Sequence, residues 1–310
     1  FASISGSSVA TAATMAKVSI PPMRKYSFNE GFAAGTVAAG GTMGILIPPS
    51  AALIVYGILT EQSIGDLFIA GIIPGIITIL LYITVIWLVA RFWPHLAPRA
   101  PKSSWSVRWH TLSKIWAVLA LFLIIIGGIS FGVFTPTEGG GIGAIGALLF
   151  AIARKKMDLK IFFYGLVEAA ETSAMIFTIA FGALILNNFV NIAEMPNDIV
   201  NFIKSLEIAP IYVILVVLAI YILLGTIIEG LAMIFLTVPI FVPLVDAMGF
   251  DLIWFGIVMV MVVEISLITP PIGLNVFIMK SMLPDVPLGT IFKGIAPFFA
   301  ADIFRLAIVV

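Results

Sequence analysis

The stretch that decides the fold is Gly40-Gly41-Thr42-Met43-Gly44-Ile45-Leu46-Ile47-Pro48-Pro49-Ser50. It lies inside an apolar run from Phe28 to Leu59. As one continuous helix that run would be roughly 48 Å long, against a hydrocarbon layer of about 30 Å. Proline lacks a backbone N–H and clashes with the preceding turn, so we expect an interrupted helix here. Unpaired backbone groups at membrane depth are tolerated only where protein buries them or where they line a cavity. The interruption is therefore a candidate binding site.

The same pattern returns near the other end of the chain as Ile268-Thr269-Pro270-Pro271-Ile272-Gly273-Leu274-Asn275. A Phe-Asn or Phe-Asp pair precedes each double proline at the same distance, as Phe28-Asn29 before Pro48 and as Phe250-Asp251 before Pro270. Downstream, Gly65-Asp66-Leu67-Phe68 and Pro74 are echoed by Gly289-Thr290-Ile291-Phe292 and Pro297. Landmarks that recur in one order and at a nearly constant offset predict an internal repeat.

Composition places the chain in a membrane. Hydrophobic residues make up 61% of it and charged residues 10%, with a mean hydropathy of +1.19. A soluble protein of 310 residues cannot bury that much apolar surface, so we expect a polytopic all-α membrane protein. The absence of cysteine excludes disulfides and thiolate metal sites. Without an initiator methionine, and with an apolar end, the chain reads as a piece of a longer polypeptide.

Charge patterning gives the orientation. Residues 91–114 carry five basic residues and no acid, and basic loops mark the cytoplasmic side.

Three parts are predicted along the chain. Residues 1–92 form a first transport half, with a re-entrant hairpin whose tip is Ser5 to Ser8, the broken helix and a span near 67–89. Residues 93–165 hold the cytoplasmic loop, scaffold spans at 115–134 and 139–153 joined by a turn at Thr135 to Glu138, and an interfacial arm at Asp158 to Phe163. Residues 166–310 form a second transport half: a crossing to Phe189, an external segment, a hairpin around 225–230, a broken helix over 252–280 and a last span.

In this topology the two units of hairpin and broken helix face opposite ways. Inverted repeats with discontinuous helices near the bilayer midplane are the architecture of secondary transporters. The predicted fold class is therefore an all-α polytopic membrane protein with inverted repeats, each holding a re-entrant helical hairpin and a discontinuous transmembrane helix.

Three stretches resemble the large membrane subunit of tripartite ATP-independent periplasmic (TRAP) transporters. They are the serine-rich run from Ser3, the run from Ala39 to Ser50, and Asp66-Leu-Phe-Ile-Ala-Gly-Ile-Ile-Pro-Gly. The resemblance covers essentially the whole chain. It implies a sodium-coupled importer of organic acids that works by an elevator movement in the bacterial inner membrane. It also implies two partners, a small membrane subunit and a periplasmic substrate-binding protein, with no enzymatic activity and no nucleic acid. One departure is Thr11, where we expect many relatives to carry aspartate.

Sodium prefers hard oxygen ligands, which backbone carbonyls and hydroxyls supply without a buried net charge. About two sodium sites are predicted, one at each hairpin tip and its neighbouring break, and no organic cofactor. The first set is Ser5, Gly6, Ser7, Gly41, Thr42, Gly44 and Pro48. The second set is Gly225, Thr226, Gly230, Thr269, Pro270 and Gly273. The alternative is that these small residues only let helices pack closely.

The organic acid substrate is predicted between the two tips, where half-helix N-termini point positive dipole ends at an anion. The side chains expected to orient it are Ser7, Ser8, Ser50, Thr226 and Asn275. No arginine is expected in the core. Intramembrane acids are costly to bury, so Glu229 is a gating or ion candidate, whereas Glu264 fits a structural pair equally well.

Three other functions compete with this one. A stand-alone dicarboxylate or citrate symporter shares the transporter architecture but needs no binding protein. An intramembrane serine hydrolase lacks a base, because both histidines lie in the basic loop. A channel is disfavoured, since paired inverted breaks suit alternating access better than a continuous pore.

Overall fold

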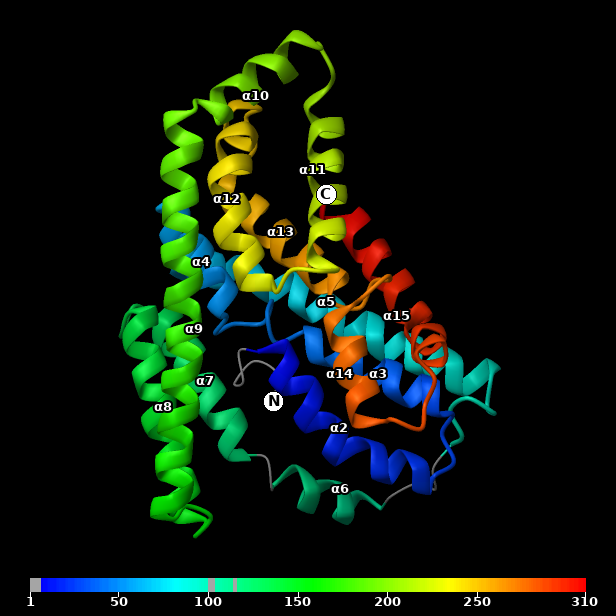
Figure 1. The fold of residues 1–310 in the computed structure, drawn as a ribbon. Coiled ribbons are helices and arrows are strands. Elements are labelled where there is room, and N and C mark those ends of the chain that lie inside the picture. Colours follow the sequence, from blue (N-terminus) through cyan, green and yellow to red (C-terminus); the bar gives the residue numbers. More distant parts are fainter. Residues whose placement is uncertain (1–6, 100–103, 114–115) are drawn as a thin grey trace. The chain divides into compact units, whose positions relative to one another are not determined.

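The computed structural model describes residues 7–99, 104–113 and 116–310, and these residues fold as α-helices without any strand (Figure 1). The chain divides into two compact units. The first comprises Phe1–Ala100 and Asn187–Val310, and the second comprises Pro101–Leu186. Each is described by itself.

The first unit contains two sets of four helices and the segment between them. The N-terminal set is α2 (Ser8–Lys25), α3 (Glu30–Thr42), α4 (Ala51–Thr60) and α5 (Ile64–Phe92). The C-terminal set is α12 (Gly230–Ala247), α13 (Leu252–Ser266), α14 (Leu274–Met282) and α15 (Leu288–Val309). Between them lie α10 (Met195–Ser205) and α11 (Pro210–Gly225).

The two sets of four helices resemble each other in length and in helix capping, as the predicted internal repeat requires. Helices α2 and α12 are both 18 residues long, and the connections from α2 to α3 and from α12 to α13 are equal in length. The N-caps of α3 and α13 match as well: the side chain of Asn29 accepts the Phe32 N–H, and that of Asp251 accepts the Trp254 N–H. The sequence repeat is therefore a repeat of structure.

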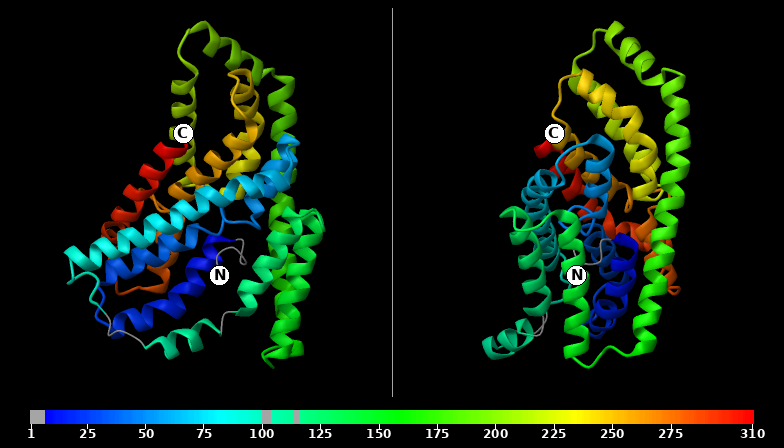
Figure 2. Two further views of the ribbon diagram at one scale, coloured as in Figure 1. Left: turned by 180° about the vertical axis from the view of Figure 1, so that it is seen from behind. Right: turned by 90° about the vertical axis from the view of Figure 1, so that its left-hand side faces the viewer.

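The two sets pack against each other reciprocally. Helix α3 packs on α15, and its counterpart α13 packs on α5. Helix α4 packs on α12, and α14 packs on α2; the pair of blue α2 and orange α14 is visible in Figures 1 and 2. Each contact between elements of the two sets thus has a counterpart between the corresponding elements, as expected for an internal repeat. This relation brings both interrupted helices into one unit.

The tightest helix contact joins α3 and α15. A Cβ on Gly294 would lie 1.8 Å from the Gly31 carbonyl oxygen, and one on Gly35 would lie 2.4 Å from the Gly294 backbone. Nearby, the Phe298 ring lies 5.8 Å from that of Phe32 and 5.2 Å from that of Tyr82, measured between centroids. Glycines let membrane helices approach closely where no hydrophobic driving force between them exists.

The second unit contains α6 (Trp105–Leu112), α7 (Trp116–Ser130), α8 (Pro136–Ala153) and most of α9 (Leu159–Ile192). Helix α7 packs on α8. Residues 135–138 were predicted as the turn between them, which is wrong. Thr135 is the N-cap of α8 and forms a capping box with Glu138, because each side chain bonds the backbone N–H of the other residue.

Two further details differ from the sequence prediction. The interfacial arm and the following crossing are one helix of 34 residues, α9, because no proline or glycine cluster interrupts them. The polar segment before the second hairpin holds the amphipathic helix α10.

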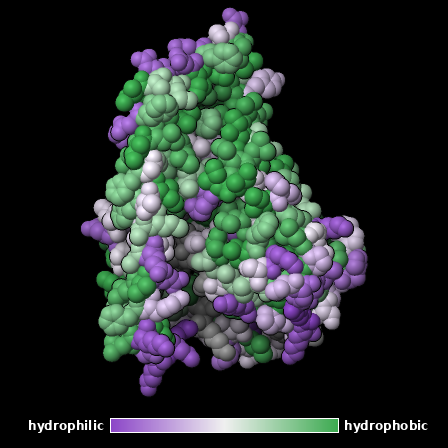
Figure 3. Space-filling model, in the orientation of Figure 1, coloured by the Kyte–Doolittle hydropathy of each residue, from purple (hydrophilic) through white to green (hydrophobic). Residues whose placement is uncertain are grey.

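By length and composition, four helices of the described chain can span a membrane: α5, α8, α9 and α12. Their outer faces are apolar and exposed, as at Ile73 (69%) and Ile185 (73%). Figure 3 shows hydrophobic residues over much of one face. Exposing so much apolar surface to water would be unfavourable, so these faces are expected to contact lipid. The structure therefore fits the predicted polytopic membrane protein.

Candidate functional site

The first interruption separates α3 from α4 over residues 43–50. Turns replace the helix ladder: the Ile45 N–H donates to the Thr42 carbonyl and the Ile47 N–H to the Met43 carbonyl, both at 3.1 Å. Ser50 caps α4, since its side chain accepts the Leu53 N–H and donates to the Ile45 carbonyl. The predicted break is therefore present, with its polar groups held inside protein.

The second interruption separates α13 from α14 over residues 267–273. The Thr269 N–H donates to the Ser266 carbonyl at 3.2 Å, and the Asn275 N–H reaches back to the Leu267 carbonyl at 3.0 Å. Gly273 adopts φ +61° at the N-cap of α14, a conformation that favours glycine. The peptide bonds Pro48–Pro49 and Pro270–Pro271 are both cis.

Helix α2, predicted as an arm of the first hairpin, lies against the end of α3. A Cβ on Gly41 would lie 3.0 Å from the Ala12 Cβ, so Gly41 permits this approach. The side chain of Ser7 caps α2 by accepting the Ala10 N–H, and Ser8 is buried. Two predicted sodium ligands, Ser5 and Gly6, lie outside the described residues.

The connection between α11 and α12, predicted as the second hairpin tip, lies against the end of α13. A Cβ on Gly225 would lie 2.1 Å from the Ser266 Oγ, and one on Gly230 would lie 2.9 Å from Val263. Thr226 is buried next to this contact. Glu229 is the N-cap of α12 and accepts the N–H groups of Leu231 and Ala232. Glu229 thus occupies the position that Ser7 has in the first repeat.

The threonine hydroxyls of both predicted ion sites are orientated alike. Thr42 donates to the Ala39 carbonyl, Thr226 to the Leu223 carbonyl and Thr269 to the Ile265 carbonyl, at 2.6–2.8 Å. A hydroxyl that donates its proton keeps oxygen lone pairs as acceptors. Thr36 and Thr84, away from the breaks, make the same bond, so this is the usual orientation of a helical threonine; it leaves the oxygen lone pairs available to a ligand.

Outside the Glu264–Asp302–Arg305 group, two buried side-chain oxygens of the described residues lack a hydrogen-bond partner: the Thr11 Oγ1 and the Asn275 Oδ1. Asn275 Nδ2 donates to the Ala38 carbonyl at 3.2 Å, so this side chain links the second break to α3 of the first repeat. A buried polar atom without a partner costs free energy unless a ligand or water satisfies it. Hard oxygens of this kind fit sodium.

The remaining predicted ligands also lie in the two helix breaks. Gly44, Pro48 and Gly273 are buried within the breaks, whereas Pro270 is exposed. The described chain has no group of three His, Cys, Asp or Glu suited to a metal, so a cation there would rely on carbonyl and hydroxyl oxygens. The predicted residues that the structure describes thus lie on two sets of elements, one for each repeat, and Asn275 links the second break to α3.

Sequence reasoning missed a buried ionic network. Arg305 of α15 is fully buried, which corrects the expectation of a core without arginine. Its Nη2 lies 2.9 Å from Oε2 of Glu264 and 3.3 Å from Oδ1 of Asp302, and its Nη1 donates to Thr78. Tyr82 donates to Oδ2 of Asp302 at 2.6 Å. The network ties α5, α13 and α15 together, and the structural pairing considered for Glu264 is the observed one.

A second ionic group lies at the exposed end of α2. Arg24 Nε lies 2.9 Å from Glu30 Oε1, and its Nη2 lies 2.7 Å from Asp285 Oδ2. The hydrogen bond to Glu30 raises the pKa of the Arg24 guanidinium. All three side chains are exposed, so this pair contributes far less stability than the buried one.

Fold and site together define a polytopic membrane protein of two repeated halves, in which oxygen-rich helix breaks face the small-residue ends of neighbouring helices. The family model "Tripartite ATP-independent periplasmic transporter, DctM component" matches residues 1–310, and the chain belongs to this family.

Several curated relatives align over the whole chain or nearly all of it. One is the C4-dicarboxylate TRAP transporter large permease protein DctM of Pseudomonas aeruginosa, 36% identical over 100% of this chain and 72% of that protein. Another is the sialic acid TRAP transporter large permease protein SiaM of Vibrio cholerae, 30% identical over 100% and 72%. The 2,3-diketo-L-gulonate TRAP transporter large permease protein YiaN of Escherichia coli is 33% identical over 96% and 69%.

Proposed function

We propose that this chain is the large-subunit core of a sodium-coupled importer of organic acid anions in the bacterial inner membrane. It would work with a small membrane subunit and a periplasmic binding protein that delivers the anion. The two helix breaks would hold the sodium ions, and the anion would bind between the hairpin tips. The first unit would move as the elevator.

The substrate class is supported by what the relatives are named for. C4-dicarboxylate, sialic acid and 2,3-diketo-L-gulonate carry a carboxylate and isethionate carries a sulfonate, so these named substrates share an organic anionic group. The site residues here fit an anion without an arginine clamp, because Arg305 is already occupied by two carboxylates. Positive charge would come instead from the sodium ions and from the half-helix N-termini.

The observation that carries the proposal is the duplicated break. Each repeat interrupts a helix at a double proline and places a small-residue helix end against the same helix. Close packing alone would not require an interrupted helix in both halves, whereas paired ion sites would, because the interruption releases backbone carbonyls.

The partner requirement is supported by the family and by one fused relative. The isethionate TRAP transporter permease protein DctMQ of Oleidesulfovibrio alaskensis is 34% identical over 97% of this chain and 47% of that protein. The name joins a second component to the large one in a single chain. This favours a binding-protein-dependent transporter over a stand-alone symporter.

The test is uptake of radiolabelled dicarboxylate or sialic acid into proteoliposomes that hold the full-length protein with its small subunit. Four conditions combine sodium or choline outside with or without the binding protein. Uptake that requires both external sodium and the binding protein supports the proposal. Sodium-dependent uptake without the binding protein would favour the stand-alone symporter, and uptake indifferent to sodium would contradict the coupling.

A further inference from the structure

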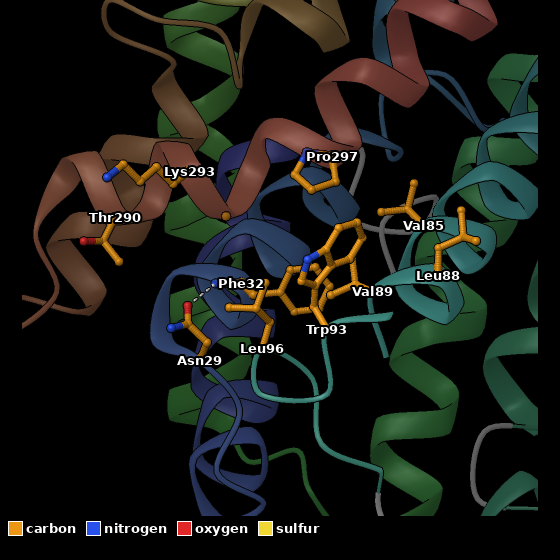
Figure 4. A pocket seen from close by; sticks show the side chains of 11 residues that line it. Asn29, Phe32, Val85, Leu88, Val89, Trp93, Leu96, Thr290, Lys293 and Pro297 are labelled. Atoms are coloured by element: carbon orange, nitrogen blue, oxygen red, sulfur yellow. Dashed lines mark hydrogen bonds between the residues drawn. The ribbon is translucent and has the colours of Figure 1, made fainter. Parts of the chain in front are cut away.

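A pocket of about 540 Å³ lies at the end of α3 opposite the first break. It is formed by α3, α5, α15 and the segment after α5, all within the first unit. Figure 4 shows its apolar side chains gathered on one side: Phe32, Val85, Leu88, Val89, Trp93 and Pro297. Nothing in the proposed transport mechanism uses it.

The other side of the pocket is polar and consists of hydrogen-bond donors. Lys293, Thr290 and Asn29 lie there together in Figure 4. The Asn29 oxygen accepts the Phe32 N–H, so its amide presents NH2 donors. The structure gives Lys293 no hydrogen bond or ion pair with any described residue. No acid lines the pocket, and the nearby Glu30 and Asp285 are both paired with Arg24.

We propose that this pocket binds an anionic phospholipid, with the phosphate at Lys293, Thr290 and Asn29 and an acyl chain along Phe32, Val89 and Leu88. The side of the pocket that carries hydrogen-bond donors matches the negatively charged phosphate. The apolar side matches the acyl chain. Basic pockets between transmembrane helices are known binding sites for anionic lipid headgroups.

The position in the membrane agrees with this occupant. Trp93 follows directly on the apolar span α5, at the level where tryptophans anchor helices to the bilayer interface. Leu88 is 37% exposed and Trp93 51% exposed, so the pocket opens on the outer surface of the unit. Lipid is the solvent at that surface. A soluble anion would not need the apolar half, and an apolar peptide segment would leave Lys293 unpaired.

The test uses full-length protein with its small subunit, in detergent supplemented with phosphatidylglycerol or with phosphatidylcholine of the same acyl chains. Native mass spectrometry counts the bound lipid, and glycerophosphate alone serves as the headgroup without chains. We expect preferential retention of phosphatidylglycerol. One basic residue near an anionic headgroup is worth about 1 kcal/mol, so Lys293→Gln should weaken phosphatidylglycerol binding about fivefold.

Lys25→Gln is the matched control, since Lys25 is an exposed lysine that does not line the pocket. Leu88→Trp should fill the apolar side and also reduce lipid retention. Equal retention of both lipids, or phosphatidylglycerol binding unaltered by Lys293→Gln, would overturn the proposal. So would a photocrosslinker at residue 88 that captures a protein segment instead of lipid.

Discussion

At the residue scale, the core can hold two buried carboxylates because the buried Arg305 guanidinium is paired with both. Arg305, Glu264 and Asp302 are each at most 1% exposed, so none can exchange its partner for water. We expect Arg305→Met to destabilise the protein by about 3–5 kcal/mol, because it leaves two buried carboxylates without their cation. Thermal unfolding of the purified protein would measure this. Adding Glu264→Gln and Asp302→Asn should recover part of the loss.

The exposed ion pair provides the control for that prediction. Arg24→Met removes a guanidinium with two carboxylate partners as well, but at the surface, where about 1 kcal/mol or less is expected. If both arginine variants melt alike, the buried network does not stabilise the first unit.

The hydroxyls at the hairpin tips give a second prediction at this scale. Thr226→Val keeps the side-chain shape but removes an oxygen that donates to Leu223, and Ser7→Ala removes the cap of α2. Each variant should need a higher sodium concentration for half-maximal uptake in proteoliposomes while remaining folded. Unchanged sodium dependence in both would refute their assignment as ion ligands.

At the scale of the element, the α3–α15 contact tests whether the two repeats need close packing. A Cβ on Gly294 would overlap the Gly31 backbone, whereas one on Gly289 of the same helix meets nothing within 4 Å. We expect Gly294→Ala to cost about 1–3 kcal/mol through overpacking. Gly289→Ala should be neutral or slightly stabilising, since alanine favours helix. Equal melting temperatures for the two variants would contradict the packing seen here.

The elements that sequence predicted well are those with strong local signals. Double prolines, glycines and N-caps fix α2 to α5 and α12 to α15, and their spacing predicted the repeat. Helix α9 was predicted as an arm at Asp158 to Phe163 and a separate crossing to Phe189, although no residue between them breaks a helix. Helix α10 was missed because it is short and largely polar.

The candidate site was predictable only in part. The residues of the breaks could be predicted, because proline and glycine interrupt a helix and leave backbone carbonyls without their helical hydrogen bonds. The contacts that these and other buried residues make with distant parts of the chain could not be predicted. Glu264 and Arg305 lie on different helices, and the link from Asn275 to Ala38 joins opposite ends of the chain. Within the network only Asp302 and Arg305 are close in sequence, one helical turn apart on α15.

At the scale of the whole molecule, orientation in the membrane is the next question. Ser106 lies on α6 in the basic segment and is exposed, while its neighbour Ser104 caps the helix. Because the chain has no cysteine, Ser106→Cys gives one unique thiol within it. If basic residues mark the cytoplasmic side, an impermeant maleimide should label this thiol in broken cells only. Ready labelling in intact cells would reverse the predicted topology.

The central claim is that the two helix breaks, related by the repeat, are the ion sites. Replacing both prolines with alanine, at 48 and 49 or at 270 and 271, lets a helical ladder re-form. Its hydrogen bonds would occupy the carbonyls that sodium needs. Sodium stabilises the folded protein by mass action, so the difference between melting temperatures in sodium and in choline reports binding. We expect each double variant to stay as stable as the parent in choline and to lose most of the sodium increment. An increment that survives in both variants would contradict the claim.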